Sequence, residues 1–454
     1  MKGYRFAGCA NYRKALRLGF IGWIFSFWPI VILLGVMILI HELGHFWAAL
    51  AVGVKVEVFS LGFGPRLFGF LRKGTDFRLS LIPIGGYVRM LGEQPGDENA
   101  VDPRSFQAKT RWQRAIVIVA GPLMNIILAV GLVTGLYMYA YPKEVDTTIT
   151  SMGPDSPAAH SGLRLGDKIV EFVGETHPTW DSIVGQEIVS AGKPLPVVVQ
   201  RNGKTLNFTV TPQLDAKEGV GLIGWGGGEQ NVQIDTVATG GPAQRAGFAP
   251  GDLFLTANGE RVFSGAIVRQ MVSHSGGKPV HFQVKHGNQI KDLTVTPEPS
   301  TKDATLPFQI GIAFRSSYQP YQFSKLGFTE AFAHSIDFNQ RNALMMFKVL
   351  GGILERRVSP KSLSGPIGMA KMSSEAAQQG AWYYLFMMAF VSLQLAIFNL
   401  LPIPILDGGT LLLLAIEMLL RREVSWQVKE NAFKLGFVFL MVLVVFVMYN
   451  DISK

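Results

Sequence analysis

The segment HELGH, residues 41–45, places two histidines and a glutamate at a spacing that suits metal-dependent hydrolysis. Residues four apart lie on one face of a helix, about one turn from each other, so His41 and His45 can direct their imidazoles at one zinc ion. Glu42 is rotated about 100° around such a helix and can hold a water molecule instead. The pattern predicts a catalytic metal site, and a structural polar cluster is the alternative.

A tetrahedral catalytic zinc ion takes a third protein ligand and leaves its fourth position to water. The extended metzincin pattern is excluded, because it requires Gly and His where Ala48 and Ala51 stand. The better candidate is remote in the sequence. Asp407, in NLLPIPILDGG (399–409), is the sole acidic residue of the apolar run 381–416. The alternative is that Asp407 caps the helix that follows it.

The composition predicts that these residues belong to a membrane protein. The chain has 454 residues, a formal net charge of +9 and only 17% charged residues, below the roughly 25% of soluble domains. With a mean hydropathy of +0.26, a bilayer explains these values better than nucleic acid, and a soluble DNA-binding protein is excluded. The single cysteine, Cys9, permits neither an internal disulfide nor a thiolate zinc finger. A metal must therefore bind to His, Asp or Glu.

Four apolar stretches are candidates for crossing the bilayer. The first, residues 19–40, has no charged residue and is long enough for a hydrocarbon core of roughly 30 Å. It is not a signal peptide, because the apolar run is too long and no small-residue cleavage site follows. We assign the four transmembrane segments to 19–54 with HELGH, 113–141, 380–420 with LDGG, and 430–450.

The distribution of Lys and Arg predicts the topology. The loop 55–112 is rich in both and should face the cytoplasm, which places both termini outside. The basic N-terminal extension, residues 1–18, disagrees with this orientation. His41 and Asp407 then lie near the cytoplasmic ends of two inward-running spans. Pro402 breaks the second of these spans, and the freed carbonyls are tolerable only beside a polar cavity, as hydrolysis requires.

Between the second and third spans lies a soluble insertion that repeats itself. The segment GLRLGDKIVEFVGE (162–175) matches AGFAPGDLFLTANGE (246–260), and TVTP recurs with the same offset of 85 residues. Two copies of one small domain are therefore expected, at 142–220 and 221–321. The Gly-Asp pair followed by an apolar strand and a turn resembles the PDZ module.

The juxtamembrane segment, residues 322–379, follows the repeats. Apolar residues recur there every three or four positions from Phe332 to Leu354, with basic residues between them. This periodicity predicts an amphipathic helix beside the membrane. A helix that packs on the repeats is the alternative.

Six segments spread over nearly the whole chain carry a family resemblance: HELGHFW (41–47), GFGPRLFGF (62–70), PIGGYVRMLGE (83–93), GPLMN (121–125), LSGPIGMA (363–370) and NLLPIPILDGG (399–409). In this order they resemble the site-2 protease family of intramembrane zinc metalloproteases, in its RseP-type branch with tandem PDZ domains. The resemblance implies one Zn²⁺ ion per chain, bound by His41, His45 and Asp407, with Glu42 as general base.

The resemblance also implies how a substrate is held. Asn399 would hold the substrate backbone near the zinc ion, although a helix–helix hydrogen bond is an alternative role. The strand-like region with PIGGYV would pair with an extended substrate, so we assign Gly85, Gly86, Tyr87 and Pro402 to substrate binding.

The expected protein is thus a polytopic α-helical membrane protein with four transmembrane helices, a membrane-associated β-hairpin region and two inserted periplasmic PDZ-like α+β domains. The resemblance implies a multi-pass bacterial inner-membrane endopeptidase. Its substrates would be single-span membrane proteins, namely a membrane anti-sigma factor after a first periplasmic cut, in envelope stress signalling, and remnant signal peptides. The lipid bilayer is its other partner, and no nucleic acid is expected.

Two alternative functions explain fewer of these sequence features. A non-catalytic PDZ membrane scaffold leaves HELGH and Asp407 unexplained. A metal transporter explains the ligands but not Glu42 or the repeats. The PDZ-like domains themselves have two possible uses: they bind newly made C-termini, or they act as a size filter, which the resemblance favours.

Overall fold

The computed structural model describes residues 8–93, 101–142, 146–153, 155–216, 218–228, 230–262, 264–300, 307–318 and 323–453. Residues 1–7 of the predicted basic extension lie outside the described residues. The chain divides into two compact units. The helical unit comprises Met1–Tyr141, Ser324–Phe347 and Leu363–Lys454, and the repeat unit comprises Pro142–Phe323 and Lys348–Ser362.

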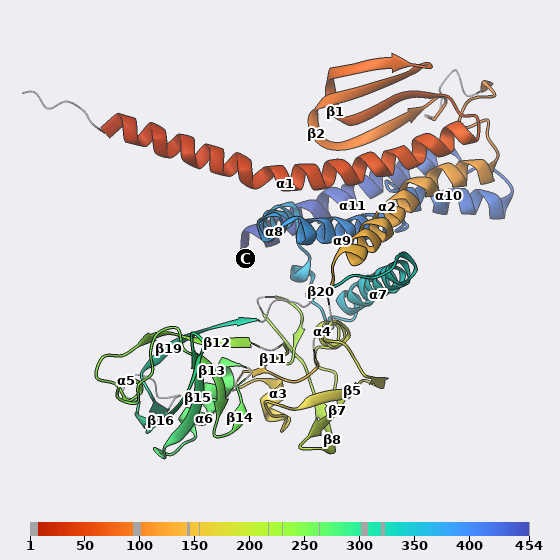
Figure 1. Ribbon diagram of the computed structural model, residues 1–454. Coiled ribbons are helices and arrows are strands. Elements are labelled where there is room, and N and C mark those ends of the chain that lie inside the picture. The colour runs from red at the N-terminus through yellow and green to blue at the C-terminus, as the bar shows by residue number, and fades with distance from the viewer. Residues whose placement is uncertain are drawn as a thin grey trace, which may run out of the picture. The chain divides into compact units, whose positions relative to one another are not determined.

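Among its described residues, the helical unit contains four helices that are long and apolar enough to cross a membrane, which confirms four candidate spans (Figure 1). These stretches are Trp28–Ala51 in α1 (Gly8–Ala51), α2 (Arg111–Tyr139), α9 (Ala381–Asn399) and Gln427–Ser453 in α11 (Trp426–Ser453). Helix α1 begins at Gly8, so the boundary predicted at residues 18 and 19 falls inside one helix. The segment predicted as one span over 380–420 is two helices, because a turn over 400–406 separates α9 from α10 (Asp407–Leu420).

Helices α1 and α2 touch backbone to backbone. A Cβ atom added to Gly44 would lie 2.2 Å from the carbonyl oxygen of Ala120, so only glycine fits at that position. Close approach of this kind is typical of helix pairs in membranes, where small residues let dispersion contacts replace the hydrophobic effect. Helix α2 starts with a capping box, since the Thr110 side chain accepts from the Gln113 backbone and the Gln113 side chain accepts from Thr110.

The loop after α1 forms a β-hairpin of two long strands, β1 (Val56–Arg72) and β2 (Thr75–Met90). Residues 56–61 pair with 76–79 and also with 86–90, so both strands fold back and build a wider sheet, with 86–90 along one edge. Phe68 and Leu71 are 72% and 75% exposed. A patch of large exposed apolar side chains on a sheet marks an interaction surface, which supports the predicted membrane association of this hairpin.

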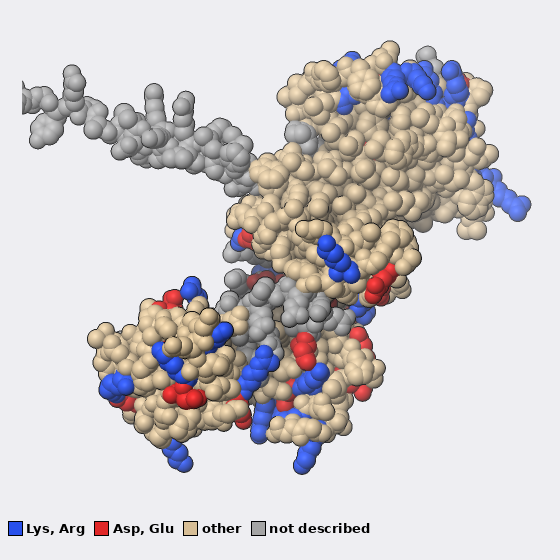
Figure 2. Space-filling model, in the orientation of Figure 1, with Lys and Arg blue, Asp and Glu red and all other residues tan. Residues whose placement is uncertain are grey.

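Figure 2 shows that the drawn face of the helical unit has few charged side chains along its helices, while Lys and Arg gather over the hairpin. Helix α7 (Phe328–Leu354), which covers the predicted amphipathic stretch, packs on α2 and α9 through Ala331 and Met346. Its Ser335 hydroxyl donates to the Val130 carbonyl at 2.8 Å. Residues of α7 up to Phe347 therefore group with the helical unit, whereas Lys348–Leu354 group with the repeat unit. The short helix α8 (Pro366–Gln379) follows.

The repeat unit holds two copies of one α+β fold, each with its own apolar core. The offset of 85 residues seen in the sequence recurs in the elements themselves. In the first copy these are α3 (Pro157–His160), β5 (Lys168–Phe172), β6 (Glu175–Thr176), α4 (Trp180–Ile188), β7 (Leu195–Arg201) and β8 (Lys204–Val210). Their counterparts are α5 (Pro242–Arg245), β13 (Leu253–Ala257), β14 (Glu260–Arg261), α6 (Gly265–Ser273), β15 (Val280–His286) and β16 (Gln289–Val295).

Strand pairing moves the boundary between the copies. The short strand β10 (Gly221–Leu222) pairs with β9 (Gln213–Leu214), and β11 (Trp225–Gly226) pairs with β4 (Ser151–Met152). Residues 221–226, expected in the second copy, therefore belong to the first. The second copy is completed by β12 (Gln230–Val237), β17 (Glu298–Pro299), β18 (Phe308–Gln309) and β19 (Ile312–Tyr318), which pair in the equivalent way.

Each copy contains a buried aspartate that pairs with a basic side chain, at the end of β7 in the first copy and at the end of β15 in the second. Asp167 accepts from Arg201 Nε at 2.6 Å and Nη2 at 2.7 Å, and also from the Arg164 backbone at 2.8 Å. Asp252, again 85 residues on, lies 2.6 Å from His286 Nδ1. Both aspartates are fully buried. An aspartate thus stabilises the turn before β5 and the turn before β13 in the same way, with arginine as its partner in the first copy and histidine in the second.

We expect Asp167→Ala to destabilise the first copy by about 3 kcal/mol, because removal of one partner leaves Arg201 and the turn without their acceptor. Hydrogen–deuterium exchange with mass spectrometry should show faster exchange in β5 and β7. Glu175→Ala, at an exposed position of β6, is the matched control and should change stability by less than about 0.5 kcal/mol. Equal exchange in the two variants would show that the pair does not stabilise the repeat.

Candidate metal centre

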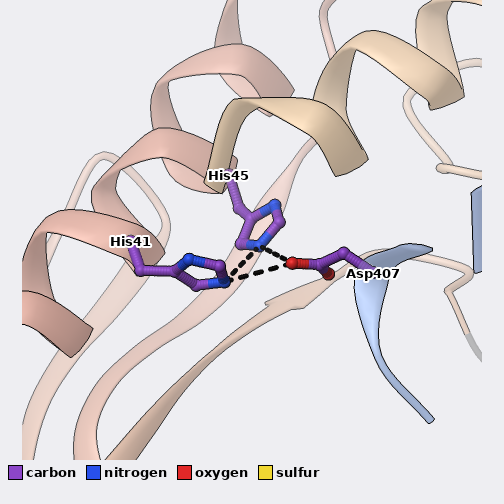
Figure 3. A group of neighbouring side chains, drawn as sticks. All are labelled: His41, His45 and Asp407. Atoms are coloured by element: carbon purple, nitrogen blue, oxygen red, sulfur yellow. Dashed lines mark hydrogen bonds and ion pairs between the residues drawn. The ribbon is translucent and has the colours of Figure 1, made fainter. Parts of the chain in front are cut away.

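Three side chains that the sequence singled out converge in the helical unit (Figure 3). His41 Nε2 and His45 Nε2 lie 3.2 Å apart, and Asp407 Oδ2 lies 3.2 Å from the first and 3.6 Å from the second. The histidines come from one face of α1, and the aspartate comes from the first residue of α10. Residues 362 positions apart are thus joined across the helix bundle.

The donor set fits a zinc ion. At a metal–ligand distance of about 2.0–2.1 Å, tetrahedral geometry separates neighbouring ligand atoms by about 3.3 Å. The three observed separations of 3.2–3.6 Å bracket this value. Two imidazole nitrogens and one carboxylate oxygen form a ligand set of the catalytic type, which keeps one position for water. The three residues can therefore hold one zinc ion.

Outer contacts from α2 orient both imidazoles. His45 Nδ1 lies 2.9 Å from the carbonyl oxygen of Val117, which assigns its proton to Nδ1 and leaves Nε2 free for the metal. His41 Nδ1 lies 3.4 Å from the amide of Asn125. Asn125 is fully buried, and its Oδ1 has no hydrogen-bond partner among the described residues. Turning this amide over would let Oδ1 accept from His41 Nδ1, with Nε2 again left for the metal.

Gly121 makes room for the two rings. A Cβ atom at this position would lie 2.3 Å from His45 Nε2 and 2.9 Å from His41 Cε1. The sequence placed Gly121 and Asn125 in a family-like segment but did not assign them a role. The signal was their spacing of four, which puts both on the face of α2 that meets HELGH.

The break between α9 and α10 places Asp407. The chain turns over 400–406, and a Cβ atom on Gly408 or Gly409 would lie 2.2 Å from the carbonyl oxygens of Leu400 and Ile403. The two glycines of LDGG therefore let the turn fold tightly against the start of α10. Pro402 is exposed in this turn. The helix ends supply the polar surroundings that an intramembrane carboxylate requires.

Glu42 lies beside the three ligands and faces the hairpin. It is half-buried, and its carboxylate interacts electrostatically with His41, His45 and Asp407 and with the backbone of Val88. A Cβ atom on Gly86 would lie 3.2 Å from Glu42 Cγ, so β2 passes directly over this side chain. The edge of the sheet is thereby within reach of Glu42.

The other residues that the sequence assigned to substrate binding lie near Glu42 and the His41–His45–Asp407 cluster, with one exception. Asn399 Nδ2 is 3.5 Å from His41 Nε2, so the amide reaches the ligands themselves. Gly85 has a φ of +101° and sits against Phe63, where a Cβ atom would overlap the ring. Tyr87 lines a cavity of about 740 Å³ between the β2 edge, α2, α10 and α11. Pro402 is the exception: it is exposed in the 400–406 turn, and Asn399 and Asp407, on either side of that turn, contact the histidines instead.

Comparison with known proteins identifies the family. Residues 29–443 match the profile of peptidase family M50. The regulator of sigma E protease of Haemophilus influenzae is 30% identical over 95% of this chain and 99% of its own length. The regulator of sigma-E protease RseP of Salmonella typhimurium is 31% identical, and that of Escherichia coli 30%, each over 93% of this chain and 97% of its own length.

A solved PDZ domain of an SdrC-like protein from Listeria monocytogenes aligns with 18% of this chain and 85% of its own length, at 21% identity and a TM-score of 0.17. The M50 match covers both HELGH and LDGG, the segments that carry the three converging side chains. The resemblance predicted from the sequence is confirmed, and the chain belongs to peptidase family M50, the family of the site-2 proteases.

Proposed function

We propose that this zinc metalloprotease hydrolyses peptide bonds in the transmembrane segments of single-span proteins, with one zinc ion bound by His41, His45 and Asp407. The observation that carries the proposal is the convergence of these three donors within 4.8 Å of one another, beside Glu42, at the ends of apolar helices. A soluble protease would not bury such a site among membrane-spanning helices, where each ionisable group costs free energy.

The residues divide the chemistry between them. A bound zinc ion lowers the pKa of a coordinated water to about 7 and polarises the scissile carbonyl. Glu42 is placed to take the proton of the attacking water and to return it to the leaving amine. Val117 and Asn125 hold the two imidazoles in position through their Nδ1 atoms. Asn399 is placed to donate its amide to the substrate backbone near the reacting bond.

A substrate helix must unwind before it can be cut, because its peptide groups are paired internally. The hairpin edge at residues 86–90 runs past Glu42 and can pair with the unwound segment by strand addition. Gly86 keeps the backbone close to the general base, since any side chain there would meet Glu42 and Ile38. This geometry supports the assignment of Gly85, Gly86 and Tyr87 to substrate binding.

The proposed biological substrates follow from the relatives. Proteins named regulators of sigma E protease match this chain over nearly its whole length. We extend that role to this protein: it would cleave a membrane anti-sigma factor after a first periplasmic cut, and remnant signal peptides. Its place would be the bacterial inner membrane, with the hairpin on the cytoplasmic side and the repeats and both termini in the periplasm.

The alternatives explain the site less well. A non-catalytic scaffold has no use for three donors at tetrahedral spacing. A metal transporter would use the donors, but not a second acidic residue, Glu42, that faces a strand edge instead of an ion path. Metal-flux assays in proteoliposomes would separate transport from proteolysis.

Glu42→Gln should retain zinc and lose cleavage by at least about 10²- to 10⁴-fold, because an amide cannot accept the water's proton. The assay is cleavage of a model single-span substrate by detergent-purified protein, alongside zinc content by elemental analysis. Glu375→Gln, an exposed residue of α8, is the control and should behave as wild type. Normal cleavage by Glu42→Gln would contradict the mechanism.

Asp407→Ala should lower both zinc occupancy and cleavage, since it removes one of three protein ligands. The loss of zinc affinity should exceed the roughly 10- to 100-fold cost of changing an outer-shell partner. Elemental analysis of wild type should give about one zinc per chain, with chelator-sensitive cleavage. Asp337→Ala, an exposed carboxylate on α7, controls for loss of charge. Full zinc content in Asp407→Ala would place the third ligand elsewhere.

The repeat unit is proposed to act as a filter that rejects substrates with a large periplasmic domain. A chain lacking residues 145–315 should then cleave a long substrate that the full chain rejects, while both chains cleave a trimmed one. Rates on the long and trimmed substrates, measured in the same detergent, provide the comparison. Equal rejection of the long substrate by both chains would rule the filter out.

A further inference from the structure

The first repeat contains a buried carboxylate that the proteolytic mechanism does not use. Glu187, near the end of α4, is only 5% exposed. Its Oε1 accepts from the backbone N–H of Ile223 at 2.5 Å, and its Oε2 accepts from Trp225 Nε1 at 3.0 Å. Burial raises the pKa of Glu187, and hydrogen bonds from Ile223, Trp225 and the Gly224 backbone oppose that rise.

The segment that receives this carboxylate has the geometry of an anion-binding loop. Gly224 adopts a φ of +76°, a left-handed conformation, directly after Ile223. A left-handed residue can turn neighbouring backbone N–H groups toward one side, which makes a concave site for a carboxylate, and the N–H groups of both Ile223 and Gly224 act on Glu187. A Cβ atom on Gly221 would lie 2.4 Å from the carbonyl oxygen of Glu187, so the segment also closes tightly on the end of α4.

The second repeat has the same loop. The Ile223 carbonyl accepts from the Ala158 N–H at 3.0 Å, and the Ile310 carbonyl accepts from the Ala243 N–H at 2.9 Å. Gly311 follows Ile310 with a φ of +74°, as Gly224 follows Ile223. Residues 310–312 are therefore the counterpart of residues 223–225.

The carboxylate, however, has no counterpart. Helices α4 and α6 correspond at an offset of 85 residues, so Val272 stands where Glu187 stands in the first repeat. Val272 is buried like Glu187, at 5% exposure. A valine side chain carries no hydrogen-bond acceptor, so Val272 cannot accept from the N–H groups of its loop as Glu187 does.

We propose that residues 223–225 form a carboxylate-binding site occupied by the chain's own Glu187, so that the first repeat is closed to the C-terminal carboxylate of a peptide. Backbone N–H groups arranged in this way capture C-terminal carboxylates in peptide-binding modules. Glu187 makes the charge-assisted hydrogen bonds that such a ligand would make. The first repeat then contributes bulk, and any recognition of a free C-terminus falls to the loop at 310–312.

Glu187 belongs to the same domain as the loop 223–225, and this covalent attachment favours Glu187 over a free peptide. A ligand tethered by a short segment acts at an effective concentration on the order of millimolar or above. A peptide must exceed that competition before it displaces Glu187. The inference rests on the other use named for PDZ-like domains, the binding of newly made C-termini, and is independent of the zinc chemistry.

The test exchanges the two residues. The full chain with Glu42→Gln, in detergent, is titrated with a fluorescent peptide that ends in apolar residues and a free carboxylate, and the amidated peptide is the control. Glu187→Val should raise the number of carboxylate peptides bound per chain by one, with no gain for the amide. The reverse exchange, Val272→Glu, should add no site and should abolish any binding at the second loop.

An unchanged number of bound peptides in a folded Glu187→Val chain would overturn the proposal, as would a peptide cross-linked at residues 223–225 of the otherwise unchanged chain. If Glu187→Val unfolds the first repeat, added acetate should restore its protection in hydrogen–deuterium exchange, whereas chloride at equal ionic strength should not. Failure of acetate would also overturn the proposal. Because cleavage is blocked throughout, a defect in proteolysis cannot be mistaken for a defect in binding.

Discussion

The close contact between α1 and α2 is the constraint on which the candidate metal centre depends. Gly44 brings the two backbones together, and Gly121 leaves the space that the two imidazoles fill. Only at this separation can the Val117 carbonyl and the Asn125 amide reach the Nδ1 atoms of the histidines. In a membrane, polar groups left without partners are costly, so the same contact that packs the helices also makes the histidines tolerable.

The remaining parts of the site come from two interruptions of regular structure. The turn over 400–406 ends one helix and starts another with Asp407 at its first position, which brings a carboxylate to the histidines. The hairpin lays a strand edge over Glu42 from the other side, with Gly86 at the crossing. Hydrolysis requires an extended substrate, water and a base at one point. A continuous helix, α1, carries Glu42, but continuous helices offer no strand edge for an extended substrate, because their backbone groups are already paired.

The repeat unit shows how one fold can keep its framework and change its polar contents. Asp167 and Asp252 fasten equivalent turns, but their partners are an arginine and a histidine. At another equivalent pair, Glu187 accepts hydrogen bonds from the loop of the first copy, whereas Val272 in the second copy carries no acceptor. Apolar cores of the same kind support both copies, so these buried polar differences distinguish the copies without changing their fold.

Local sequence patterns determined much of this protein. Four apolar runs, an offset of 85 residues and a pair of histidines one helical turn apart are properties of neighbouring residues or fixed spacings, and the spans and repeated elements follow them. Other features arose only when distant segments packed together. Such contacts divide 380–420 into two helices and assign residues 221–226 to the first copy. They also determine which groups Gly121, Asn125 and Glu187 meet. Spacing along the chain puts Gly121 and Asn125 on one face of a helix, but which backbone lies opposite that face is set only in three dimensions.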